Sequence, residues 1–174
     1  MHPKARTCLV LALFPLGAAC SLLSASCSHN IRRSVEGKLN ADWRNRSYSL
    51  DAYCKHPDTL ILDLSRVSSA SPVDLFRGVF QASEALYEGV DINFDKVILA
   101  RQGKPIFFIE GGDFSTLGAE FKNGQNPIYL IRTLPEKLYL PGGESAFPRW
   151  EGGWLGVFSK QMEDANQAAR QWSQ

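Results

Sequence analysis

Short apolar runs near the middle of the chain predict a group of β-strands. Thr59–Leu64, Lys96–Arg101 and Lys104–Glu110 are each six or seven residues long and rich in branched or aromatic side chains, which is typical of strands. Gln102-Gly103 separates the last two runs, and a two-residue link containing glycine favours a tight antiparallel hairpin. Alternating apolar positions over 46–53 indicate one more strand before these three.

Apolar residues at helical spacing predict helices on both sides of the hairpin. Ser71-Pro72 begins one helix, because serine caps free amides and proline fits the first turn. Asp113 is expected to cap a short helix after the hairpin, and residues 128–134 are read as a further helix, with a strand as the alternative. A longer helix is predicted from Trp154 to Trp172, where apolar positions recur at intervals of three and four.

The order (β)βαββα(α)α predicts an α+β fold: a small, largely antiparallel sheet with helices packed on it, ending in a long C-terminal helix. A length of 174 residues fits one domain, and a hydrophobic share of 44% argues against a disordered chain. We assign this single domain to 46–174. Residues 20–45 are expected to be a tether, because from about 30 to 45 the chain is polar and charged with little apolar periodicity.

The first residues have the three parts of a secretory signal peptide. Lys4 and Arg6 give a basic start, residues 8–14 form an apolar centre, and small residues follow at 17–19. A membrane span is the alternative. Pro15, a glycine and several serines interrupt the stretch, whereas a span needs roughly 20 strongly apolar residues. We therefore expect a cleaved leader.

Two pentapeptides at the end of this leader resemble the lipobox of bacterial lipoproteins. They are Leu16-Gly17-Ala18-Ala19-Cys20 and Leu23-Ser24-Ala25-Ser26-Cys27, and both have leucine four residues before the cysteine where the commonest pattern has three. In that family the cysteine becomes the first mature residue and carries acyl chains. The resemblance implies a signal peptide over 1–19 and lipidation of Cys20, with 1–26 and Cys27 as the alternative.

Acylation also implies a place in the cell. Two acyl chains hold a protein firmly on a membrane, whereas one binds only marginally. Serine follows either cysteine, and in Gram-negative lipoproteins this implies the outer membrane, with the protein facing the periplasm. Lysine and arginine total 19 against 18 acidic residues, so charge gives no argument for a nucleic-acid partner.

A cluster of Cys54, His56 and Asp58 contains residue types used in metal sites and Cys/His nucleophile pairs. No histidine or cysteine follows in the chain to complete a ligand set, so we expect a structural turn and no metal or cofactor. If Cys20 is acylated, Cys27 and Cys54 remain and can form a disulfide. If Cys27 is acylated, Cys54 stands alone.

The segment 140–154 is the most unusual part of the chain, with two glycine pairs, two prolines and three aromatic residues. Loops of this kind carry function more often than cores do. Arg149 and Trp150 are typical of interface hot spots, and with Glu144 and Trp154 they form a candidate binding surface. The alternative is that Phe147 and Trp150 plug the core beneath the loop.

No complete catalytic set is present in the sequence, which favours a non-enzymatic role. We expect an envelope lipoprotein that binds another envelope protein, as an assembly or stability factor or as an immunity protein against an exported toxin. The alternative is a lipoprotein that binds or hydrolyses cell-wall glycan. In that case Trp150 or Trp154 would stack on sugar, and Glu110 with Asp113 or Glu144 would serve as the acids.

Overall fold

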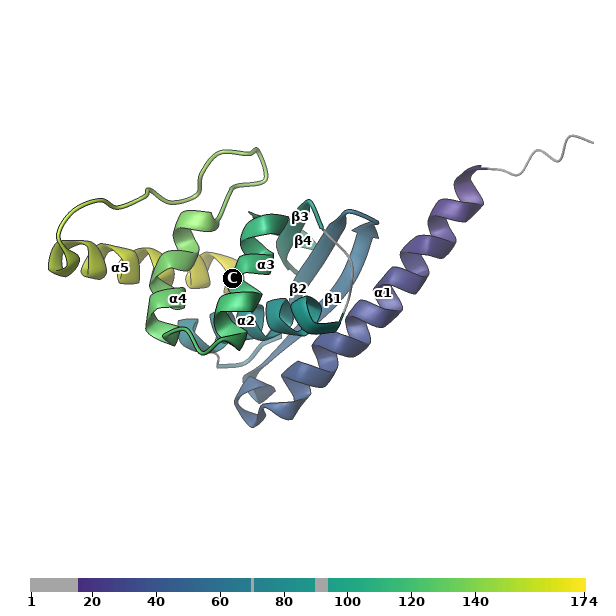
Figure 1. The fold of residues 1–174 in the computed structure, drawn as a ribbon, viewed down its shortest axis with the longest axis horizontal. Helices are drawn as coiled ribbons and strands as arrows, with labels where there is room; N and C mark the ends of the chain where they lie inside the picture. The colour runs from purple at the N-terminus through teal and green to yellow at the C-terminus, as the bar shows by residue number, and fades with distance from the viewer. Residues whose placement is uncertain (1–15, 70, 90–93) are drawn as a thin grey trace, which may run out of the picture.

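The computed structural model describes residues 16–69, 71–89 and 94–174, with side chains described from residue 29 onward except at 70, 89–93, 154 and 155. The residues at 4–14 that predict a leader lie outside this range. In chain order the elements are α1 (Leu16–Ala41), η1 (Trp43–Ser47), β1 (Tyr48–His56), β2 (Thr59–Val67), α2 (Pro72–Gly89), β3 (Lys96–Arg101), β4 (Lys104–Glu110), α3 (Gly111–Lys122), α4 (Pro127–Thr133), η2 (Leu134–Lys137) and α5 (Trp154–Ser173). The predicted α+β class is confirmed (Figure 1).

The four strands form one mixed sheet in the order β1-β2-β3-β4. β1 with β2 and β3 with β4 are antiparallel, while β2 and β3 are parallel, because α2 carries the chain back across the sheet. The expected hairpin between β3 and β4 is confirmed. Its turn residues Gln102 and Gly103 both have positive φ, 51° and 80°, which suits the two-residue turns that follow strand twist.

One face of the sheet is covered and forms the core with the helices. Alternate strand residues on this face are at most 7% exposed and pack with apolar side chains of α1, α2 and α5. They are Leu50, Ala52, Cys54, Leu60, Leu62, Leu64, Val97, Leu99, Phe107 and Ile109. Trp172 near the end of α5 is fully buried, and its Nε1 donates to the carbonyl of Ala100 at 2.8 Å. The predicted C-terminal helix is therefore docked by its last turn.

Residues 29–45, expected to lie in a tether, instead form the end of α1 and the short helix η1. Ile31, Val35 and Leu39 recur every fourth residue and are at most 6% exposed. Three apolar positions are enough to fix a helix once other elements supply a surface for them, because tertiary packing provides most helical stability. Lys38 adds an ion pair to Glu84 of α2, with Nζ 3.0 Å from Oε1.

α2 and α3 pack so closely that one of their residues must be glycine. A Cβ at Gly118 would lie 2.6 Å from the carbonyl oxygen of Ser83, closer than real Cβ contacts allow. The Ser83 hydroxyl donates to the carbonyl of Phe114 across the same contact. In Figure 1, α2 lies in front of β1 and β2, and α3 stands beside β3 and β4.

None of the helices within the described ranges is long and apolar enough to cross a membrane.

Candidate functional site

The loop predicted to bind a partner runs from the end of η2 to the start of α5. Tyr139 joins its first residues to the edge of the sheet, since Tyr139 and Phe108 exchange two backbone hydrogen bonds of 2.9 Å. The next residues turn back sharply: the amide of Leu140 donates to the carbonyl of Glu144 at 2.8 Å. Glu144 is exposed in this turn.

Phe147 anchors the middle of the loop. Its side chain is 5% exposed and packs at a tilted angle on Phe107 of β4, with 6.0 Å between the ring centroids. Ser145 fixes the backbone there, because its hydroxyl donates to the carbonyl of Phe147 at 2.7 Å. The alternative reading, in which Phe147 plugs the core under the loop, is confirmed for this residue.

Trp150 is fixed against α5 and is only partly exposed. Its Nε1 donates to Oδ2 of Asp164 at 2.6 Å, and Nζ of Lys160 lies 4.3 Å from its ring centroid. Both contacts hold the indole in place, so the ring serves the loop's own structure. The side chain of Trp154 lies outside the described residues.

The side chain of Arg149 in this loop is exposed to solvent. Its side chain is 77% exposed, and its nearest carboxylate is that of Glu136, with Nε 4.0 Å from Oε2. A pair so long and so exposed contributes little to stability. Of the four residues predicted for the binding surface, Arg149 and Glu144 are therefore exposed to solvent, whereas Trp150 packs against α5.

The open face of the sheet carries a row of apolar and aromatic side chains that sequence reasoning missed. Tyr53, Ile61, Ile98 and Phe108 are register partners across the four strands, and Tyr139 continues the row beside β4. Ile61 is 8% exposed, and the other four are partly exposed. The signal was present in the sequence as period-two alternation, but only the register shows that the residues form one continuous row.

Charged groups border this row on both sides. Nζ of Lys96 lies 4.0 Å from the ring centroid of Phe108, whose ring also stacks on Tyr139 at 5.1 Å. On the other side Asp51 faces Asp63 across β1 and β2. Burial raises the pKa of Tyr53, and the carboxylates of Asp63 and Asp51 raise it further. The row thus has Lys96 beside Glu110, its register partner, on one border and two carboxylates, those of Asp51 and Asp63, on the other.

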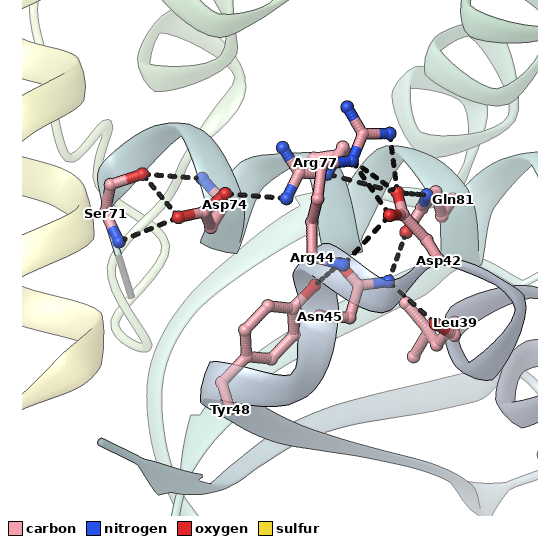
Figure 2. A network of polar contacts seen from close by, with 9 residues as sticks. All are labelled: Leu39, Asp42, Arg44, Asn45, Tyr48, Ser71, Asp74, Arg77 and Gln81. Atoms are coloured by element: carbon pink, nitrogen blue, oxygen red, sulfur yellow. Dashed lines mark hydrogen bonds and ion pairs between the residues drawn. The ribbon is translucent and has the colours of Figure 1, made fainter. Parts of the chain in front are cut away.

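A second cluster of polar side chains lies at the corner where α1, η1 and α2 meet (Figure 2). Asp42 is at its centre. Its Oδ2 lies 2.7 Å from Nη2 of Arg44 and 3.5 Å from Nε of Arg77, and it also accepts from Nε2 of Gln81 at 2.9 Å. The Arg44 hydrogen bond holds the pKa of Asp42 well below its usual range, against the effect of burial.

Asn45 extends the corner cluster into the core. This residue is 8% exposed; its Nδ2 donates to Gln81 at 2.7 Å and to the carbonyl of Leu39 at 2.9 Å. Its Oδ1 accepts from the hydroxyl of Tyr48 at 2.7 Å, and burial raises the pKa of that phenol. The amide side chain thereby joins α1, β1 and α2.

At the far end of the corner cluster, Ser71 caps α2 by accepting the amide of Asp74 on its hydroxyl oxygen at 3.2 Å, and the Asp74 side chain binds back to Ser71. Its Oδ2 accepts from the hydroxyl of Ser71 at 2.7 Å, and its Oδ1 accepts from Nη2 of Arg77 at 2.6 Å. Burial alone would raise the pKa of Asp74, but the hydrogen bonds from Ser71 and Arg77 outweigh it and leave the pKa lowered. A hollow of about 480 Å³ lies beside the corner and is bordered by Asp42, Asn45 and Tyr48 among others. Because the side-chain groups of the cluster bind one another, its chemistry is that of a structural clamp.

Cys54 and His56 both lie in β1 but in different surroundings. Cys54 is 7% exposed on the covered face and is disulfide-bonded, whereas His56 is exposed at the strand end. Among the residues that the structure describes, no group of three or more His, Cys, Asp or Glu side chains is placed to hold a metal ion.

The carboxylates proposed for glycan hydrolysis are engaged in separate contacts. Asp113 lies in the first turn of α3 instead of at its cap, because the helix begins three residues earlier than expected, and its Oδ1 is 2.5 Å from Nζ of Lys137. Glu110 faces Lys96 in the sheet register. Four surface hollows within the described ranges are lined by other residues.

Compared with protein-family models, curated proteins and solved structures, the chain shows no match.

Proposed function

We propose that this chain is a lipid-anchored protein of the bacterial cell envelope that works by binding another protein. The anchor rests on the leader and on the lipobox-like sequence ending at Cys20. One observation carries the binding role: the loop with exposed Arg149 and Glu144 is continuous, through Tyr139, with the apolar row on the open sheet face.

The composition of this surface defines its partner. We call the row Tyr53, Ile61, Ile98, Phe108 and Tyr139, together with the loop 139–153, the contact face. Partly exposed aromatic rings next to arginine are typical of protein interfaces. The Asp51 carboxylate on one border favours a protein partner with a basic group next to an apolar strip. We propose that the chain acts as an assembly or stability factor or as a toxin-neutralising protein.

A capture experiment tests the binding role. The full chain, expressed in its natural envelope and chemically cross-linked there, is expected to retain a defined partner. Ile98→Asp is expected to remove that partner, because it places a carboxylate in the middle of the apolar row. Val73→Asp is the matched control, since Val73 is 45% exposed at the start of α2, away from the row.

Folding must be checked in both variants by their melting temperatures. Tyr139→Arg gives a second disruption at the loop end of the row, where the side chain is partly exposed. Capture that is equal for the natural chain and for both contact-face variants would contradict the binding role. Intact mass of the native protein tests the anchor separately, because acylation of Cys20 requires a mature chain that begins there.

A further inference from the structure

Cys54 has a bonded partner that can be identified from the fold. It lies near the end of β1 on the covered face of the sheet and is disulfide-bonded. The chain has four cysteines, at positions 8, 20, 27 and 54. The partner is therefore one of three residues, all earlier in the sequence.

α1 and β1 run in opposite directions and pack side by side. The chain leaves α1 at Ala41, turns through η1 and returns along β1, as Figure 1 shows at the side of the molecule where α1 lies. Ile31, Val35 and Leu39 are the buried residues on α1, and they share one core with the covered face of β1. A residue on this face of α1 therefore lies next to the β1 residue at the same height, that is, at the same level along the two antiparallel elements.

The heights can be matched from a surface hollow that both elements line. His29 and Arg32 of α1 line one surface hollow together with residues 51–53 of β1, so these two segments lie side by side. From Ala52, the middle of the strand segment, Cys54 is two residues, or about 7 Å, along the strand at about 3.3 Å per residue. From His29 and Arg32, position 27 is two and five residues, or about 3 and 8 Å, back along the helix at 1.5 Å per residue.

Position 27 is one further step of four before Ile31, the spacing that keeps the residues of a helix on one side. Cys20 lies seven residues earlier, which is about 10 Å beyond that height. A disulfide requires Cα atoms about 4.4–6.8 Å apart, so an offset of this size excludes Cys20. Cys8 lies earlier still in the chain.

We propose that Cys27 and Cys54 form a disulfide that fixes α1 to the edge strand β1. Two thiols lose two protons and two electrons to form the S–S bond, and the electrons reduce the disulfide of a thiol–disulfide oxidoreductase to its dithiol. This oxidant is available outside the cytoplasm, so in cells the bond rests on the proposed envelope location. The pairing leaves Cys20 as the cysteine available for acylation and thereby decides between the two lipobox-like sequences.

Refolding of the purified chain tests the pairing without reference to location. A full chain carrying Cys8→Ser and Cys20→Ser keeps only Cys27 and Cys54. After refolding in a glutathione redox buffer, we expect both thiols to resist alkylation and a tryptic digest to contain peptide 47–55 linked to the peptide with Cys27. We also expect the melting temperature to fall by about 5–15 °C on reduction.

Cys27→Ser in the same background is the matched control, and it is expected to make Cys54 open to alkylation once the chain is unfolded. Alkylation of both cysteines in the refolded double variant would overturn the pairing. So would native protein in which Cys54 is linked to Cys20 or acyl chains are carried by Cys27. Unprocessed chain recovered from the cytosol would contradict the proposed function, while the refolding result would still decide the pairing.

Discussion

The corner around Asp42 and the loop 139–153 are both rich in polar residues, but they use them in opposite ways. At the corner, carboxylate, guanidinium and amide groups bind one another across α1, η1 and α2. In the loop, Phe147 and Trp150 hold the backbone, and the charges of Arg149 and Glu144 are left facing solvent. The dense polar cluster therefore joins elements of the fold, and the sparser one belongs to the surface that we propose for contact with a partner.

The difference has a physical basis. A buried polar group must find partners inside the protein, or folding loses the hydration that water provided. The corner meets this demand with side chains far apart in sequence. The loop avoids it by burying aromatic rings and leaving its charges in water. Variants at the two regions should therefore separate stability from binding.

The largest effect is expected from Asp42→Ala at the corner. The change removes the acceptor shared by Arg44 and Gln81 and the second carboxylate beside Arg77, which keeps its ion pair with Asp74. Donors left without an acceptor in a partly buried site cost about 2 kcal/mol. Urea unfolding of the full chain measures the free energy of unfolding, and binding by any molecules that remain folded should be unchanged.

Arg44→Ala is the control for this prediction, because Arg44 contacts the same carboxylate but its side chain is 51% exposed. Its loss is expected to cost less than about 1 kcal/mol. Combining Asp42→Ala with Arg77→Met also breaks the ion pair between Arg77 and Asp74 and should therefore lower the free energy of unfolding further. Equal losses from Asp42→Ala and Arg44→Ala would show that the corner is not a clamp.

Acid should weaken the corner. The folded-state pKa values of Asp42 and Asp74 are lowered, so the unfolded chain binds more protons than the folded chain as the pH falls below about 4. Their contribution is fully present above that pH and is lost as the pH falls toward the folded pKa values. Urea midpoints between about pH 5 and pH 2 should therefore decline.

Asp42→Asn should make this decline shallower, because its amide does not titrate in this range. Glu163→Gln on the exposed side of α5 is the control and should leave the slope unchanged. Identical slopes in the natural chain and in Asp42→Asn would argue against a part for Asp42 in acid stability.

Local sequence patterns predicted most of the fold but little of the corner. The β3–β4 hairpin, the start of α2 at Pro72 and the docking of Trp172 depend on neighbours in sequence or on strong periodicity. The corner joins Asn45 to Gln81, 36 residues away, so no local pattern indicates it. α1 was missed because its apolar face between 29 and 41 is only three residues, Ile31, Val35 and Leu39, among polar ones.

The candidate site was also predicted only in part, because its arrangement depends on contacts between residues far apart in the sequence. Composition singled out the loop with Arg149, but it gave no means of deciding which aromatic residues face outward. The hydrogen bond from Trp150 to Asp164 settles that question, and it joins residues on the loop and on α5. The row from Tyr53 to Tyr139 depends on strand register, which only the assembled sheet provides.

The smallest effect on stability, and the sharpest contrast with the corner, is expected from Arg149→Ala. Its guanidinium is 77% exposed and 4.0 Å from Glu136, so removing it should change the free energy of unfolding by less than about 0.5 kcal/mol. Affinity for the captured partner should nevertheless fall at least about tenfold, because arginine at an interface loses both packing and charge on truncation. Titration calorimetry with that partner measures the loss, and Glu136→Gln controls for the charge of the neighbouring carboxylate. Unchanged affinity in Arg149→Ala would move the contact from the loop to the sheet face alone, whereas a loss of stability matching that of Asp42→Ala would erase the distinction between the two regions.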